Sequence, residues 1–191
     1  MVAPDEFRLA FVDSGLVGFD RSILEMVELQ GPEAHWLVDV GLPRSAAPFL
    51  SFGGTNVNQL PTTTLLYGLR ELKVPDRYRI IGSNGSGDPI AIDIGEQGRI
   101  VYLNHDDQFA AVFVNSSVRQ LCDSLFAYKQ LVDVTRKENG DRAYLEGNVP
   151  DRALKAFVIR LETVDPKSLL RGSMWRSEID QLGWRPTAVD H

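Results

Sequence analysis

The sequence predicts a mixed fold of strands and helices, built around three consecutive strands and the helix that follows them. Isoleucines occupy every second position from Ile90 to Ile94, which is the period of a strand with one buried face. Residues 95–98 have a glycine at each end, as in hairpin loops, because glycine tolerates the positive φ of such turns. Apolar residues recur at helical spacing after Ser117. Together these observations predict one hydrophobic unit in which a helix covers hairpin-connected strands.

This central unit extends from Arg79 to Tyr128. Residues 78–82 lead into a glycine-rich connection over 83–88, and we expect strands over 89–94, 99–104 and 109–114. The polar turn between the last two strands is His105-Asp106-Asp107. Ser117 and Gln120 have capping-box spacing, which predicts a helix start. One stripe of this helix is expected to pack on the sheet: Val118, Leu121, Cys122, Leu125, Tyr128 and Val132.

The chain before the central unit is less regular. Residues 7–27 fit either a helix or a strand. Gly31-Pro32 and Gly41 bracket a predicted short helix over 34–40, since proline favours the first helical turn and glycine the C-terminal end. After it we expect a strand over 48–52, an irregular loop over 53–64 and a strand or extended segment over 65–74.

The chain after the central helix is predicted to be helical. Residues 137–141 indicate a charged turn, and a helix is expected from Pro150-Asp151 with apolar residues on one face. Asp165 before Pro166 predicts a capped helix start, and Trp175 lies on an apolar stripe that indicates a core position. Without a repeat or linker, residues 1–191 are expected to form a single domain, with a helical C-terminal part from about residue 151.

The composition indicates a compact protein that works by binding another protein. The 191 residues, 43% of them hydrophobic and 24% charged, suffice for a sizeable core. The formal charge of −6 argues against a nucleic-acid surface and suits a basic protein partner. The single cysteine, Cys122, excludes an intramolecular disulfide and fits a reducing compartment. No signal peptide is visible at the start and no apolar run is long enough to span a bilayer, so we expect a cytoplasmic protein.

Motifs for catalysis or cofactor binding are sparse. The connection over 82–88 lacks a P-loop ending and enters a strand, so a tight turn is favoured over a phosphate site. His35, His105 and His191 lie far apart, and neither zinc-ligand spacing nor a hydrolase elbow is present.

A metal site is the enzymatic alternative. Asp88 and Asp93 could join residues 105–107 to hold a divalent ion for phosphodiester hydrolysis, because hard cations prefer carboxylate oxygens. Against this, Asp and Asn at turns usually satisfy their own backbone. We therefore expect no catalytic residues, no metal and no cofactor.

Several short segments follow one another in a characteristic order. They are Gly41-Leu42-Pro43 followed by 49–53, Gly87-Asp88 before a strand, Val101-Tyr102-Leu103-Asn104-His105-Asp106, Asn115-Ser116-Ser117 before a helix, and Asp165-Pro166 with Trp175 beyond it. This order resembles the SUKH (SMI1/KNR4-like) superfamily, and the last segment is similar to the tail of its SUKH-4 branch. The resemblance covers most of the chain and implies an α+β fold, a mostly antiparallel sheet with flanking helices.

The resemblance also implies a function. SUKH-4-like proteins are immunity proteins of bacterial polymorphic toxin systems, and they occlude a cognate toxin, often a nuclease or a nucleic-acid deaminase. The implied partner here is therefore a toxin, expected to be basic, with neither nucleic acid nor membrane bound. From polarity and position we expect the partner-facing residues on the sheet-edge loops: Asp88, Glu96, His105, Asp106 and Asp107. Two alternatives stay open, a regulatory or scaffold domain of the same superfamily and a metal-dependent phosphodiesterase or nucleotide-binding protein.

Overall fold

The computed structural model describes residues 1–53, 60–62, 64–65 and 76–184. Its strands are β1 (Leu16–Val17), β2 (Leu42–Pro43), β3 (Ser45–Ala46), β4 (Leu50–Phe52), β5 (Tyr78–Ser83), β6 (Pro89–Asp93), β7 (Arg99–Asn104) and β8 (Ala110–Asn115). Its helices are α1 (Pro4–Ala10), α2 (Arg21–Met26), α3 (Gly31–Asp39), α5 (Val118–Asn139), α6 (Asp151–Val164) and α7 (Met174–Gln181), with 3-10 turns η1 (Ile94–Glu96), η2 (His105–Asp107) and η3 (Pro166–Leu169). Helices combined with antiparallel sheets confirm the α+β class.

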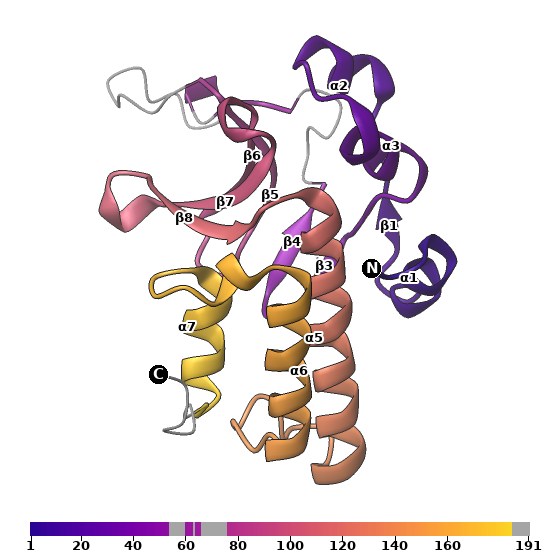
Figure 1. Cartoon of the computed structure of the whole chain (residues 1–191), viewed down its shortest axis with the longest axis vertical. Coiled ribbons are helices and arrows are strands. Elements are labelled where there is room, and N and C mark those ends of the chain that lie inside the picture. Colours follow the sequence, from indigo (N-terminus) through magenta and orange to yellow (C-terminus); the bar gives the residue numbers. More distant parts are fainter. Residues whose placement is uncertain (54–59, 63, 66–75, 185–191) are drawn as a thin grey trace.

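The main sheet has six strands in the order β3-β4-β5-β6-β7-β8, and all neighbouring strands are antiparallel (Figure 1). The three strands predicted in the central unit are present as β6, β7 and β8, with ends shifted by at most one residue, and the residues that lead into them form a further strand, β5. The prediction that β6 has one buried face is wrong, because all five of its residues are buried. Ile90 and Ile92 belong to the main core, whereas Ala91 packs in a second apolar cluster with Ile80 and Val101.

Helix α5 is the long helix beside the sheet, and it carries the predicted buried stripe (Figure 1). Its first turn is capped by Ser117, whose Oγ accepts a hydrogen bond from the Gln120 N–H at 3.2 Å. The reciprocal half of the predicted capping box is absent, because the Gln120 amide donates to the Val164 carbonyl at 2.9 Å instead. Cys122 is fully buried, and burial raises the pKa of its thiol, so this cysteine packs in the core as predicted.

Residues 137–139, predicted as part of a charged turn, continue α5, which ends at Gly140 with φ +98°. The basic residues Arg136 and Lys137 suit this last turn, because cations are favourable near a helix C-terminus. In the described part of the chain, no helix combines the length and the apolar character needed to cross a bilayer.

Helices α5, α6 and α7 run side by side (Figure 1). Three aromatic rings, one from each helix, pack together between them. The ring centroid of Tyr128 lies 5.1 Å from Phe157 and 5.5 Å from Trp175, and the last two are 5.8 Å apart. Trp175 is fully buried, which confirms its predicted place in the core. Trp184, beyond the end of α7, is half-buried against the same core. The rings fix the three helices relative to one another.

The N-terminal part resolves the ambiguous segment 7–27 into α1, β1 and α2. Phe7 and Phe11 are buried while Leu9 is 75% exposed, so the apolar spacing is that of a helix and not of a strand. Helix α3, predicted from Gly31-Pro32, presents Trp36 to the Arg119 guanidinium, which lies 3.6 Å from the ring centroid. This contact joins the N-terminal helices to α5.

The segment around β4 departs from the sequence prediction. The strand begins at Leu50 and not at Pro48, because Phe49 adopts a left-handed conformation with φ +65°. Leu65, predicted to be extended, is helical, and its N–H bonds to Thr62 Oγ1 at 3.3 Å as at a helix start. The rest of the extended segment over 65–74, and most of the loop predicted over 53–64, lies outside the described residues.

Candidate partner-binding surfaces

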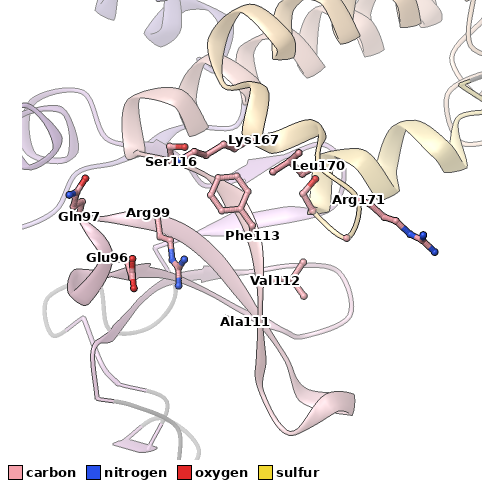
Figure 2. Close-up of a pocket in the computed structure, with 12 residues that line it drawn as sticks. Glu96, Gln97, Arg99, Ala111, Val112, Phe113, Ser116, Lys167, Leu170 and Arg171 are labelled. Atoms are coloured by element: carbon pink, nitrogen blue, oxygen red, sulfur yellow. The ribbon is translucent and has the colours of Figure 1, made fainter. Parts of the chain in front are cut away.

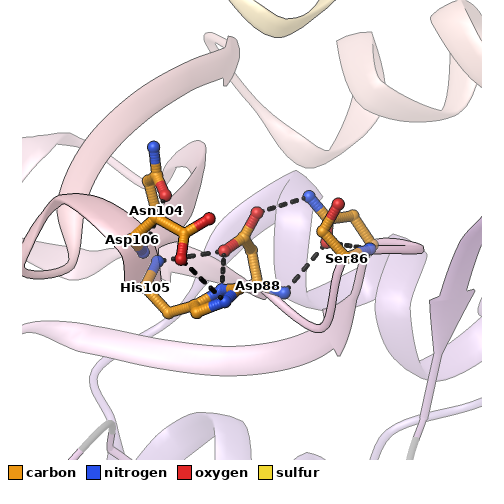
Figure 3. A network of polar contacts seen from close by, with 6 residues as sticks. Ser86, Asp88, Asn104, His105 and Asp106 are labelled. Carbon is orange, nitrogen blue, oxygen red and sulfur yellow. Dashed lines mark hydrogen bonds and ion pairs between the residues drawn. The ribbon is translucent and has the colours of Figure 1, made fainter.

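Two turns at one end of the sheet are joined by the buried carboxylate of Asp88 (Figure 3). Asp88 Oδ1 accepts hydrogen bonds from the main-chain N–H of His105 at 3.0 Å and from its ring Nδ1 at 2.6 Å. Asp88 Oδ2 accepts from the Asn84 amide at 2.8 Å. The β5–β6 turn and η2 are thereby held side by side. We call the exposed residues His105, Asp106 and Asp107 the acidic turn surface, whereas Asp88, expected to face the partner, is buried and holds this surface in place.

Asparagine side chains fix the backbone of both turns. Asn84 Oδ1 accepts from the N–H groups of Ser86 at 3.0 Å and Asp88 at 2.9 Å, so the glycine connection is a tight turn, as the sequence predicts. Asn104 Oδ1 accepts from the Asp106 N–H at 3.0 Å and caps η2 in the same way. The Asp106 side chain is 86% exposed. The exposed carboxylates of η2 are therefore presented by a backbone that is already ordered.

The charges of His105 and Asp88 depend on one another. The hydrogen bond to Asp88 raises the pKa of the His105 imidazole, and the nearby carboxylates act in the same direction against a smaller desolvation effect. Burial disfavours the ionised form of Asp88, but the bonds donated by His105 and Asn84 outweigh it and lower the pKa of that carboxyl. Protonated His105 and ionised Asp88 thus stabilise each other.

We expect NMR titration to place the pKa of His105 above about 6.5, its usual value. A group whose pKa is raised on folding stabilises the protein fully below the unfolded pKa, and this contribution disappears as the pH rises through the folded pKa. The Asp88→Asn variant removes the negative charge and is expected to return the pKa of His105 toward its usual value. An unchanged pKa in that variant would contradict the pairing.

The structure does not bring all the predicted site residues together. Glu96 lies in η1, at the other end of β7 from His105, and the length of that strand separates the two by roughly 20 Å. Asp93 lies at the opposite end of β6 from Asp88, fully buried, with carboxylate oxygens 3.1 Å from Arg77 Nε and 3.0 Å from Arg99 Nη2. The metal alternative that combined Asp93 with residues 105–107 therefore lacks the geometry for one ion. Within the described ranges, no three His, Cys, Asp or Glu residues form a metal-binding group.

An exposed aromatic residue beside the acidic turn surface was missed by the sequence analysis. Phe49, which the sequence placed inside a strand, is 67% exposed and lies against Gly85 of the β5–β6 turn. A Cβ at Gly85 would lie 2.8 Å from the Phe49 Cβ, so only glycine permits this approach. No local sequence signal marks the left-handed φ of Phe49, since bulky residues rarely adopt it.

Phe49 forms the rim of a cleft of about 440 Å³, the Phe49 cleft, which reaches Tyr102, Met174 and Glu178. Glu178 accepts a hydrogen bond from the Tyr128 hydroxyl, which also lies 3.0 Å from the Tyr144 hydroxyl. Burial raises the pKa of Glu178, although the bond from Tyr128 opposes the shift. The cleft therefore combines apolar lining residues such as Phe49 and Met174 with the polar Glu178.

Another buried network holds the last strand against the C-terminal helices. Asp165 was predicted to cap the helix that follows it, but it makes no side-chain cap bond to η3. Its carboxylate instead accepts from the Ser116 N–H at 2.7 Å, the Ser116 hydroxyl at 2.9 Å and the Asn115 amide at 3.1 Å. Asn115 Oδ1 accepts from Trp175 Nε1 at 2.9 Å. A buried carboxylate gains more from these donors than from the first turn of a short 3-10 helix.

This network positions residues 167–173 beside β8, and the two together enclose a groove of about 610 Å³, the β8 groove (Figure 2). Figure 2 shows Phe113 between Arg99 on one side and Leu170 on the other. Lys167 and Arg171 also line this groove, as does Glu96. Glu96 therefore belongs to a groove in which cations outnumber carboxylates, apart from the acidic turn surface.

Comparisons with known proteins identify the family of the chain. The sequence matches the model of the SUKH-4 immunity protein family over residues 2–181, from α1 to the last residue of α7. Searches of curated proteins and of solved structures returned no match. The family is generally non-enzymatic. The chain therefore belongs to the SUKH-4 immunity protein family, which implies a role in immunity to a toxin.

Proposed function

We propose that the protein binds one cognate bacterial toxin and neutralises it by covering the toxin's active cleft. The observation that supports this proposal most is the combination of a rigid acidic turn surface with the exposed Phe49 beside it. Protein interfaces derive most of their affinity from a few desolvated aromatic anchors, and complementary charges add steering and choice of partner. Both components lie close together, because Phe49 packs against the β5–β6 turn that Asp88 joins to η2.

The sign of the charge favours one class of toxin. Nucleases and nucleic-acid deaminases need a basic cleft to hold their phosphate-rich substrates. Asp106 and Asp107 are exposed at the tip of the β7–β8 hairpin, which projects from the sheet (Figure 1). Because the hydrogen bonds of Asp88 and Asn104 already order this tip, little conformational entropy is lost when it enters a cleft. An acidic projection of this kind fits a basic nucleic-acid-binding cleft.

We expect Asp106→Asn combined with Asp107→Asn to slow association with the toxin encoded beside the gene by about tenfold at low salt. The dissociation rate should change less, because exposed rim charges act mainly on the encounter. Association of the natural protein should slow as salt rises, and the double variant should show a weaker salt dependence. Surface plasmon resonance at several salt concentrations measures both effects.

The matched control is Asp141→Asn combined with Glu162→Gln, which removes the same charge from exposed positions at the α5–α6 connection and on α6. This control should associate nearly as fast as the natural protein. Association that is independent of salt would remove the electrostatic part of the proposal. The absence of any toxin gene beside this one, together with binding to a host protein, would favour the regulatory alternative.

A further inference from the structure

Strand β8 is the last strand of the six-stranded sheet, and its outer edge over residues 110–113 lacks the usual protection, because the bulge of β8 against β7 comes only at Val114. Exposed edge strands are normally blunted by lysine, proline or a bulge, because their free N–H and C=O groups pair with other strands. Residues 110–114 are Ala-Ala-Val-Phe-Val, without charge or proline. Apart from its ladder with β7, the main chain of these residues makes no hydrogen bond to the part of the chain that the structure describes. The outer edge is therefore open to a further strand over residues 110–113, while Val114 and Asn115 are buried.

The β8 groove runs beside this open edge and is rich in cations. Lys167 and Arg171 are exposed and form no ion pair with any described residue, while Arg99 is already paired with Asp93. The only carboxylate among the groove's described lining residues is Glu96. Leu170, 62% exposed, and the half-buried Phe113 supply apolar surface between these charges. Such a cation-rich groove contrasts with the net charge of −6 of the whole chain.

We propose that β8 accepts an added strand from a partner protein, an extended segment with acidic side chains at alternate positions. Main-chain hydrogen bonds to the open edge would supply affinity, as in other cases of strand addition. Because side chains of a strand alternate between its two faces, carboxylates at every second position would all face the side of Lys167 and Arg171. The apolar side chains between them would lie on the other face.

A second copy of the chain is a poorer occupant. If two copies paired through β8 about a two-fold axis, each copy would bring the same cations, Lys167 and Arg171, to one interface. Like charges so close together oppose association. Nucleic acid is also disfavoured, because the net charge of the chain is negative and a phosphate backbone offers no alternating N–H and C=O groups to pair with β8.

The test uses a labelled eight-residue peptide, acetylated and amidated, in which glutamate alternates with valine or threonine. The full chain is expected to bind it, and hydrogen exchange should show new protection of alternate amides between Ala110 and Phe113. A peptide of the same sequence that is N-methylated on its hydrogen-bonding edge should lose binding, because it cannot pair with β8. A peptide with lysine in place of glutamate should bind more weakly than the acidic peptide at low salt.

Charge-reversal variants test whether the acidic peptide binds at this groove or responds only to the net charge of the protein. Lys167→Glu combined with Arg171→Glu is expected to weaken binding of the acidic peptide by about tenfold or more. The matched control, Lys137→Glu combined with Lys155→Glu, makes the same change in net charge on exposed parts of α5 and α6 and should retain binding within about twofold. Circular dichroism of both variants checks that the fold is kept.

Several outcomes would overturn the inference. Binding that survives N-methylation would show an electrostatic contact and not an added strand. Equal losses in the two charge variants would place the peptide elsewhere, and self-association protected at residues 110–113 would identify a second copy as the occupant. A single-stranded oligonucleotide that competes for the groove would point to nucleic acid. None of these measurements involves the toxin, so the inference and the proposed function fail independently.

Discussion

Replacement of Trp175 by alanine is expected to lower the free energy of unfolding by about 3–5 kcal/mol, the usual cost of removing a large aromatic side chain from a core. Trp175 is fully buried between Tyr128 and Phe157, so its removal leaves a cavity where three helices meet. It also removes the donor to Asn115 Oδ1. The loss is a large part of the 5–15 kcal/mol that typically separates the folded from the unfolded state. Urea unfolding followed by far-UV circular dichroism measures it.

Trp175→Phe is the matched variant, because it keeps one aromatic ring in the core while it removes the indole N–H together with part of the ring volume. It leaves the Asn115 oxygen without its buried donor, for which we expect a cost of about 1–3 kcal/mol. The difference between the two variants then gives the part due to packing. A Trp175→Ala protein as stable as the natural one would show that the aromatic cluster does not hold α5, α6 and α7 together.

Replacement of Phe49 by alanine is expected to weaken binding of the cognate toxin by about 30-fold or more, the effect of losing an interface anchor worth about 2 kcal/mol. Phe49 is largely exposed in the free protein, so its burial in a complex would remove a large apolar surface from water. The loss should appear mainly in the dissociation rate, in contrast to that of the carboxylate variants. Stability should change by only about 0.5 kcal/mol, since little packing is lost.

Leu145→Ala provides the control for this prediction. Leu145 is a similarly exposed apolar residue, but it lies in the α5–α6 connection, away from the acidic turn surface. Its replacement should leave the affinity for the toxin unchanged. A Phe49→Ala protein that binds with natural affinity would remove Phe49 from the interface, while leaving the acidic turn surface to be tested by its own charge variants.

The central unit was predictable because its signals are local. The alternating isoleucines of β6, the glycines that flank its hairpin and the Ser117 cap of α5 all concern residues within one turn or strand. The same locality explains the errors. Residues 137–139 look like a turn by composition, but they continue α5, whose buried face reaches Thr135. The pattern of β6 shows its helix-facing isoleucines, but the cluster that buries Ala91 comes from β5 and β7.

The candidate site was only partly predictable. Polarity and position near a turn identified Asp88 and residues 105–107, which the structure does bring together. Glu96 has the same local character, yet one strand length separates it from them. Phe49 escaped notice because its exposure results from a left-handed φ and from contact with Gly85, thirty-six positions later in the chain. The position of a polar residue near a hairpin turn could therefore be predicted from the sequence. The end of the sheet at which that turn lies could not.

The sequence by itself determined the α+β class, the family, the hairpin-connected strands and the buried stripe of α5, because each is encoded by spacing or by motifs along the chain. Only the tertiary structure decided the partners of the buried carboxylates and the shapes of the surfaces. Asp165 precedes a proline as a cap should, but it bonds to Ser116, forty-nine positions away. Buried polar groups take whichever donors the packed fold brings within reach, and no local pattern specifies them.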